Sequence, residues 1–314
     1  MDLELNEDQR TILDALDALC RPYEAAPIHE APLAASNIDL ERAITESGFL
    51  DVAFDPDLGC VTAALVIERL AKLPYAVEAA ATTLVRPLLG DDVTYPLCLT
   101  ENVRSGRPVR YLREGATVIH LGDQVSCFTA EEHQVRAQPE ALFAYPVATL
   151  VNPPQDSRKL AITPSDICTR WQIGLAAESA GLLSAALDST CTYLADRKQF
   201  GRPLATVQAL RHRLAEAQVR TNGVRWLALK AAASLDPADA AMAALHAQES
   251  ARLCVYDFHQ FLGAMGMTLE HPLHLWTYRL KLLMGELGGR GEQALMAADQ
   301  LWGATGTKQG KQVQ

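Results

Sequence analysis

Apolar residues recur at helical spacing along nearly all of the C-terminal half of the sequence. The pattern occupies four long stretches, at residues 167–197, 206–234, 238–263 and 271–301. Turn-forming residues separate them, and Asp236 can cap a helix whose first residue is Pro237, a favoured helix start. Four long helices with short connections predict an antiparallel four-helix bundle over residues 166–302.

The rest of the chain divides into two parts with different patterns. Residues 1–90 keep the helical spacing, with Ile12, Leu13, Leu16 and Leu19 on one face. Residues 91–165 change to short β-prone runs separated by Gly, Pro, Asp and Asn, at 93–99, 117–121, 124–128 and 148–151. We therefore expect a mainly α protein with a small β domain. Its parts would be an N-terminal helical domain (1–90), a middle β-barrel-like domain (91–165), the bundle (166–302) and a flexible tail (303–314).

Charge and composition exclude several classes of function. The formal net charge is −10, and no block of Lys and Arg could neutralise a run of phosphates, so we expect no nucleic-acid partner. The acidic N-terminus lacks the basic segment of an export signal. The longest apolar stretches, such as 226–235 with Lys230 inside it, are too short to span a membrane, so we expect a cytoplasmic protein without membrane contact. Seven cysteines without metal-ligand spacing argue against a disulfide framework or a zinc site.

Two blocks in the C-terminal half carry the most specific pattern. The first is Arg197-Lys198-Gln199-Phe200-Gly201, which ends a helix and is followed by a turn and a helix that begins Val207-Gln208-Ala209. The second runs from Gln260 through Gly263 and Gly266 to Thr268-Leu269-Glu270-His271. Two such blocks in this order, after helices and then strands, resemble the acyl-CoA dehydrogenase family.

This resemblance implies an FAD cofactor and the residues that hold it. In the family the two blocks bind the ADP half of FAD and reach across a subunit interface to a flavin held mainly by the neighbouring protomer. Arg197 offers a permanent, forked cation suited to pyrophosphate oxygens, and Gly263 lets the backbone approach a ligand closely. The resemblance implies the following cofactor-binding residues: Arg197, Gln199, Phe200, Gln208, Gln260 and Gly263.

Taken in isolation, the same residues also allow a purely structural interpretation. Arg197 could complement the helix dipole, and Gly201 could simply end the helix. Phe200 could be a core aromatic residue rather than a cofactor contact. Only the whole pattern favours the cofactor interpretation.

The reaction of this family needs a carboxylate near the α carbon of a CoA thioester, in a dry pocket that raises its pKa. The two positions where family members carry it fall here on Leu287 and Trp171, and neither is a carboxylate. Glu286 is the remaining candidate base, but one step along a helix rotates a side chain by about 100°, so we expect it to point elsewhere. We expect Glu178 to be packed or hydrogen-bonded and Glu270 to be structural.

The family's flavin-ring segment is also reduced, to Thr100-Glu101. A kept ADP-half motif without a base predicts a subunit of a heteromeric acyl-CoA dehydrogenase, similar to the short subunits of the α2β2 enzymes of bacterial steroid degradation. The implied partners are an acyl-CoA substrate, a homologous subunit that carries the flavin ring and the base, and electron-transfer flavoprotein or a similar acceptor. Three alternatives stay open: a self-sufficient homotetramer with Glu286 as base, a structural or regulatory paralogue without flavin, and a flavin monooxygenase of the same fold.

Overall fold

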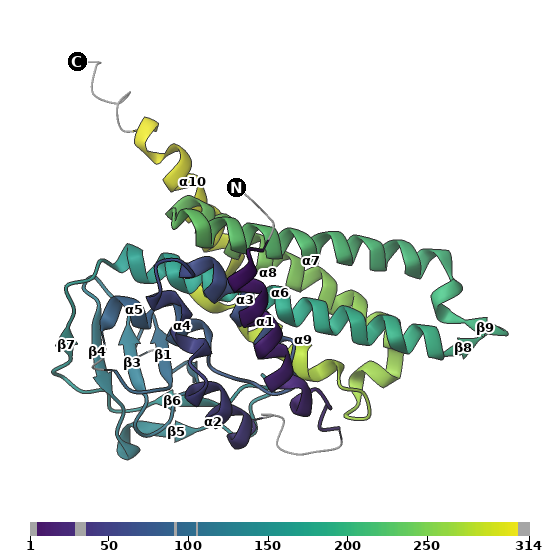
Figure 1. Ribbon diagram of the computed structural model, residues 1–314, viewed down its shortest axis with the longest axis horizontal. Helices are drawn as coiled ribbons and strands as arrows, with labels where there is room; N and C mark the ends of the chain where they lie inside the picture. Colours follow the sequence, from purple (N-terminus) through teal and green to yellow (C-terminus); the bar gives the residue numbers. More distant parts are fainter. Residues whose placement is uncertain (1–4, 29–35, 91–92, 105, 307–314) are drawn as a thin grey trace.

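Figure 1 shows a computed structural model of the chain in which long helices extend to one side of a β region, with short N-terminal helices packed against both. The structure describes residues 5–28, 36–90, 93–104 and 106–306, and for residues 304–306 the backbone only. The chain therefore follows the predicted order of helices, strands and helices.

Short helices form the N-terminal part. They are α1 (Glu7–Cys20), α2 (Ile38–Glu46), α3 (Gly59–Ala71), α4 (Ala80–Leu84) and α5 (Arg86–Leu89), with the 3-10 turns η1 (Arg21–Tyr23) and η2 (Phe49–Phe54). Helix α1 begins at a capping box in which Asn6 and Gln9 bond each other's backbone N–H groups, which satisfies donors at the helix start. Its buried residues Leu13 and Leu16 lie on the face that the sequence predicts.

The middle part contains two small sheets. One has the strand order β1 (Leu97–Thr100), β3 (Thr117–His120), β4 (Ser126–Thr129) and β7 (Arg158–Lys159), and the other has β2 (Pro108–Arg110), β6 (Val147–Leu150) and β5 (Val135–Ala137), which follows the turn η3 (Glu132–Gln134). Strands β1 and β3 are parallel, and the other pairs of these two sheets are antiparallel. Within the described residues the strands do not close into a barrel, so the barrel-like expectation holds only loosely.

Helix α6 (Pro164–Asp196) is the central element of the C-terminal part. It begins at Thr163, whose side chain accepts the N–H of Asp166, and its 33 residues make it about 50 Å long. Helices α3, α7 (Gln208–Ser234), α8 (Pro237–Leu262) and α9 (Leu273–Leu283) all pack against it. A helix covered on so many sides needs apolar or small residues on most of its surface, which explains its weak amphipathic pattern.

The remaining elements connect or follow these helices. A two-stranded hairpin, β8 (Lys198–Gln199) and β9 (Arg202–Pro203), and the turn η4 (Leu204–Thr206) join α6 to α7, and η5 (Gly263–Met267) follows α8. The turn η6 (Glu286–Gly288) separates α9 from α10 (Gly289–Gly306).

The fourth predicted helix, 271–301, is wrong as a single element, because it is the two helices α9 and α10. Leu287, Gly288 and Gly289 have φ values of 51°, 73° and 72°, and three successive residues with positive φ cannot continue a right-handed helix. Helix α10 also runs to Gly306, into the stretch predicted to be a tail, while 307–314 lie outside the described residues.

The described part of the chain contains neither a helix that could cross a membrane nor a cluster of metal ligands. None of the helices there is long and apolar enough to cross a membrane. The same residues contain no group of three or more His, Cys, Asp or Glu side chains that could hold a metal ion.

Gly181 allows α6 and α3 to approach closely, and this gives a test of the packing. A Cβ atom at position 181 would lie 2.2 Å from the carbonyl oxygen of Glu68 and 2.8 Å from Cβ of Ala71. We expect Gly181→Ala to lower the free energy of unfolding by about 1–3 kcal/mol, since overpacking must shift a helix backbone. At Gly291, in helix α10, an added Cβ atom would meet no neighbour within 4 Å. Gly291→Ala should therefore be neutral or stabilising. Thermal unfolding of both variants distinguishes them, and equal stabilities would contradict this packing.

Candidate functional site

A hollow of about 650 Å³ lies between the β region and the turn that joins α9 to α10. We call it the cleft. Its walls come from the end of β1, from β2 and from α6, α9 and η6. The lining residues used below are Glu101, Arg110, Trp171, Lys281 and Glu286.

Arg110, on β2, joins two carboxylates at the floor of the cleft. Its Nε and Nη2 atoms donate to the two carboxylate oxygens of Glu286 at 2.6 and 3.1 Å, and Nη1 donates to Glu178 Oε2 at 2.9 Å. The side chains of Arg110, Glu178 and Glu286 are 13%, 8% and 15% exposed. The guanidinium therefore compensates two nearly buried negative charges, one on α6 and one on η6.

Two further donors complete this network. Tyr145 Oη donates to Glu178 Oε1 at 2.6 Å, and Trp171 Nε1 donates to Glu286 Oε2 at 3.0 Å. The Arg110 guanidinium also lies 4.9 Å from the ring centroid of Tyr145. Burial disfavours its charged form, but the two carboxylates outweigh burial and hold the pKa of Arg110 well above its ordinary value.

Buried glutamines fix the turn that carries Glu286. Gln248, on α8, donates to the carbonyl oxygens of Leu283 and Glu286 at 3.0 and 2.9 Å. Gln293, on α10, donates to the Leu287 carbonyl at 2.7 Å and accepts from Gln172 of α6 at 2.7 Å. The turn is therefore held through its backbone from α8 and α10, and Gln172 of α6 orients one of the two amides.

The expectation that Glu286 points away from the site is wrong. It rested on a continuous helix through residue 286, and the chain instead turns there, with Leu287 in the left-handed region. Leu287 points into the core beside Cys168 and Trp171, while Glu286 lines the cleft. Glu178 is hydrogen-bonded and buried, as expected.

Glu78 is another buried carboxylate close to this network. Its Oε1 accepts the N–H of Ala81 at 2.8 Å, and its Oε2 accepts the Thr82 hydroxyl. Glu78 shares a small hollow of about 20 Å³ with Arg110 and Trp171. Burial raises the pKa of Glu78 to about 7, although these hydrogen bonds and Arg110 act in the opposite direction.

The predicted cofactor residues lie elsewhere, at the end of the bundle where α6 and α8 end and α7 begins (Figure 1). The two sequence blocks meet there, because the ring of Tyr193, one turn before the first block, packs edge to face on His271 of the second block with centroids 5.4 Å apart. Arg213, just after the first block, also forms an ion pair with Asp257, just before the second block. The structure therefore brings the two blocks together.

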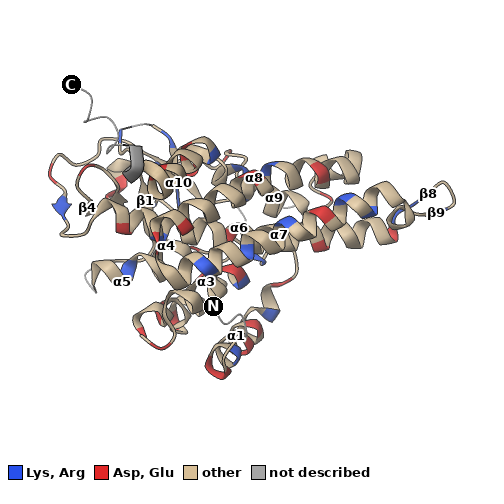
Figure 2. Cartoon of the chain, turned by 90° about the horizontal axis from the view of Figure 1, so that it is seen from above, with Lys and Arg blue, Asp and Glu red and all other residues tan. Residues whose placement is uncertain are grey.

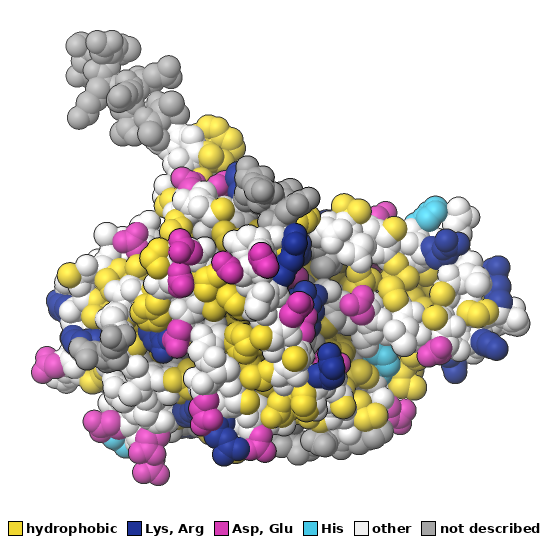
Figure 3. All heavy atoms as spheres, viewed as in Figure 1, with side chains coloured by type: hydrophobic (Ala, Val, Ile, Leu, Met, Phe, Trp, Pro, Cys, Tyr) yellow, Lys and Arg dark blue, Asp and Glu magenta, His cyan; other side chains and the backbone are white. Residues whose placement is uncertain are grey.

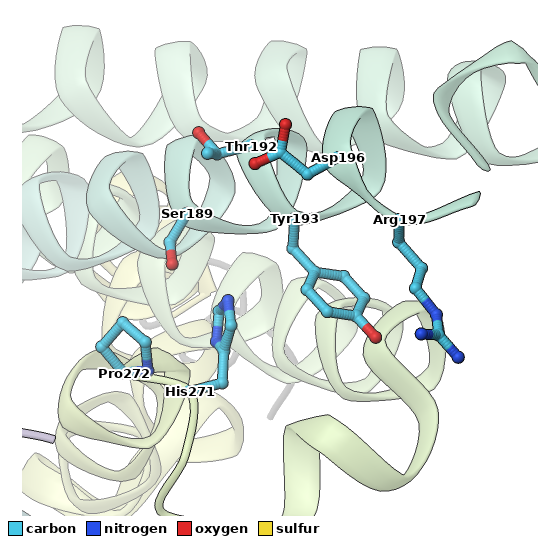
Figure 4. A pocket seen from close by; sticks show the side chains of 7 residues that line it. All are labelled: Ser189, Thr192, Tyr193, Asp196, Arg197, His271 and Pro272. Atoms are coloured by element: carbon cyan, nitrogen blue, oxygen red, sulfur yellow. The ribbon is translucent and has the colours of Figure 1, made fainter. Parts of the chain in front are cut away.

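Arg197 lines a pocket of about 610 Å³ that the two blocks share. Figure 4 shows Arg197 and the Tyr193 hydroxyl pointing to the same side of α6, with His271 facing Ser189. The ring of His271 accepts the Leu273 N–H at Nδ1, which orients it. We call this hollow the Arg197 pocket.

The β8–β9 hairpin carries Gln199 and Phe200 beyond the ends of the helices. Phe200 is 92% exposed and has a φ of 54°, an unusual backbone conformation for an aromatic residue, and Gly201 follows with a φ of 78°. Figure 2 shows Lys and Arg residues on the hairpin, and Figure 3 shows side chains of these types gathered at the same end of the molecule. A strained, exposed aromatic residue among cations contradicts the core interpretation of Phe200 and suits contact with another molecule.

Gln260 and Gly263 line a separate groove of about 530 Å³, which we call the Gln260 groove. Tyr256, Tyr278 and Lys281 also line it. Gly263 has a φ of 59°, and a Cβ atom there would meet no neighbour within 4 Å, so the backbone is open to the groove. Gln208, the last predicted cofactor residue, is exposed on α7, and its side chain lies 3.4 Å from His212 Nε2.

Sequence reasoning placed the cofactor residues at one end of the bundle but missed Arg110 and Lys281. No local signal marks Arg110, which is a single Arg in a three-residue strand. Lys281 could have been paired with Tyr278 from the sequence, because the two are three residues apart and residues at this spacing are neighbours on a helix.

Comparison with known proteins identifies the family of the C-terminal part. Residues 169–301 match the family described as "Acyl-CoA dehydrogenase, C-terminal domain". The C-terminal part of this chain is an acyl-CoA dehydrogenase C-terminal domain. A relative that reaches further is the acyl-CoA dehydrogenase IpdE2 of Mycolicibacterium smegmatis, which is 28% identical over 228 residues, 69% of this chain and 71% of that protein.

Solved structures share the fold of the whole chain. The ChsE4–ChsE5 complex of Mycobacterium tuberculosis matches with a TM-score of 0.73 at 19% identity, covering 96% of this chain and 99% of that one. The steroid ACAD Tcur3481–Tcur3483 matches with a TM-score of 0.75 at 18% identity, with the same coverage. At these identities the likeness shows the fold, including the N-terminal and β parts outside the matched domain.

The Arg110 network gives a test of charge compensation in the cleft. We expect Arg110→Met to lower the free energy of unfolding by about 3–5 kcal/mol, because it leaves two buried carboxylates without their cation. Arg113→Met is the matched control, since Arg113 pairs with Glu41 at the surface and should contribute less than about 1 kcal/mol. Denaturant unfolding of both variants gives the two values, and a small effect of Arg110→Met would contradict the network.

Glu78 predicts a pH dependence of stability. Its folded pKa of about 7 lies above its ordinary value of 4.5, so the folded state binds a proton that the unfolded state has released. Stability should therefore fall by up to about 3 kcal/mol as pH rises from 4.5 to 7, and Glu78→Gln should remove this fall. Thermal unfolding between pH 5 and 8 measures it. In Glu249→Gln the fall should persist, because Arg252 lowers the pKa of Glu249 and takes its titration below this range.

Proposed function

We propose that this chain is a subunit of an FAD-dependent acyl-CoA dehydrogenase and that it contributes the ADP-half site of an FAD to a partner chain. The exposed bundle end carries this proposal. Arg197, Gln199 and Phe200 are exposed at the end of α6 and on the β8–β9 hairpin, where a second chain could bring a cofactor to them. The ring of that flavin and the catalytic base would belong to the partner.

The residues present fit the ADP half of the cofactor better than they fit its ring. Arg197 supplies a forked cation for phosphate oxygens, and Gln199 and Gln260 supply amide donors and acceptors for a ribose or a phosphate. Bound FAD would accept the β-hydride of the acyl group while a carboxylate takes the α-proton. In the cleft of this chain Arg110 and Trp171 both bond the carboxylate of Glu286.

This engagement of Glu286 also weighs against the self-sufficient alternative. A base must offer a free oxygen to the α-proton, and both carboxylate oxygens of Glu286 already accept hydrogen bonds from Arg110 or Trp171. Position 287, where the family's base would stand, is a buried leucine. We therefore place the proton abstraction in the partner subunit.

The proposal extends to partners and substrate. The steroid ACAD that shares the fold suggests a bulky, steroid-derived acyl-CoA as the substrate. The reaction would introduce an α,β double bond, with electrons passing to electron-transfer flavoprotein or a similar acceptor. Each of these points follows from resemblance and needs its own test.

The test compares the chain alone with the chain coexpressed with its genomic neighbours. We expect a yellow complex that contains FAD and a partner subunit. Arg197→Ala should weaken FAD binding by roughly 10- to 100-fold, the loss of one or two charge-assisted hydrogen bonds. FAD absorbance per complex after dialysis measures this, and Arg136→Ala, an exposed arginine on β5, is the control.

Two outcomes would contradict the proposal. Stoichiometric FAD and dehydrogenation by the chain alone would show a self-sufficient enzyme. A colourless complex that keeps its partner would instead support a structural paralogue without flavin.

A further inference from the structure

Helix α10 has apolar residues on its outward side as well as toward the protein. It packs on the protein through Gln293, which donates to the turn η6, and through Met296 and Ala297, which are partly or fully buried. A surface helix normally carries polar residues on the side away from the core. On α10, Leu295 and Leu301 lie on that side and are 62% and 47% exposed. Figure 1 shows the helix running beyond the other elements.

The outward apolar residues form one continuous strip. Successive residues of a helix are about 100° apart, so five residues fall within about 120° of the circumference of α10. They are Ala294, Leu295, Ala298, Leu301 and Trp302. Asp299 and Gln300 fall outside this arc, and the strip itself contains no charged residue. Figure 3 shows hydrophobic side chains at the end of α10 that projects from the molecule. We call these five residues the α10 strip.

The α10 strip is complementary to a second copy of itself. Ala298 lies at its centre, both along the helix and around it. In two antiparallel copies that cross at Ala298, Leu295 of one copy faces Leu301 of the other, and the small Ala294 faces the large Trp302. The alanine at the crossing lets the two helices approach closely. Such a contact is the same on both copies, as a two-fold interface requires. Because the strip carries no charge, it has nothing to select a partner of opposite charge.

We propose that α10 of this chain pairs antiparallel with α10 of a second copy through the α10 strip. The strip is only about 12 Å long, which is too short to bury the roughly 800 Å² per copy that a stable dimer needs. The contact therefore joins two copies inside a larger assembly and does not form a dimer alone. This inference goes beyond the proposed function, which concerns one copy of this chain and its partner.

Disulfide formation in the coexpressed complex tests the pairing, in a Cys191→Ser background because Cys191 is exposed. Mild oxidation of Ala298→Cys should link two copies of this chain on a non-reducing gel, since two thiols at a close crossing can reach disulfide distance. Gln300→Cys is the matched control, exposed on the same helix but outside the strip, and should not link. Leu295→Cys and Leu301→Cys chains should link to each other when coexpressed. Self-linking of each instead would show parallel helices and overturn the antiparallel pairing.

A charge in the strip tests the same contact in solution. Leu295→Asp should raise the dissociation constant between the two copies by roughly tenfold or more, measured by sedimentation of the complex, because the contact would bury a carboxylate. Gln300→Asp adds the same charge outside the strip and should leave the assembly unchanged. Thermal unfolding checks that each variant folds, and the FAD content should stay the same.

The other outcomes separate this inference from the proposed function. An Ala298→Cys complex that holds FAD but forms no link between copies would overturn the pairing and leave the proposed function standing. A link from Ala298→Cys to the partner subunit would overturn the choice of a second copy. A link between two copies in a complex without FAD would support the pairing and contradict the proposed function.

Discussion

The ion pairs of Arg110 determine how the β region and the helical bundle of this chain meet. One guanidinium on a short strand binds a carboxylate on the longest helix and another on the turn between α9 and α10. Either carboxylate left alone at this depth would cost several kcal/mol. Because the network is almost closed to water, the β region and the bundle cannot separate without exposing or uncompensating these charges. The cleft therefore has a rigid floor.

The rigid floor of the cleft and the exposed end of the bundle have different roles, although the fold can combine both in one chain. The floor of the cleft ties one guanidinium to two carboxylates through hydrogen bonds, and it is nearly buried. The bundle end is the reverse, with a strained, exposed aromatic residue at the hairpin tip and backbone open at Gly263. Such features cost stability and persist where they contact another molecule. The groups to which the proposed function assigns the cofactor thus face outward.

The helices that depend on local sequence pattern could be predicted from the sequence. The contacts between residues far apart in the chain could not. Helices α6, α7 and α8 follow from spacing and caps, and the blocks at their ends predicted one shared site. The turn at Leu287 was missed because buried amides support its backbone, and one of them, Gln248 of α8, lies 38 residues from Glu286. Arg110 and Glu286 are 176 residues apart, and no periodicity reports such a contact.

The same turn determines what a carboxylate at position 287 would meet. Leu287 points into the core against Cys168 and Trp171, and burial and Glu286 raise the pKa of nearby Glu101. A glutamate at position 287 would enter an apolar pocket close to two carboxylates and without a new cation, a costly position for a charge. Introducing a carboxylate there would require rebuilding the turn, its amide supports and the Arg110 network together. The buried leucine and the closed floor of the cleft are therefore parts of one arrangement.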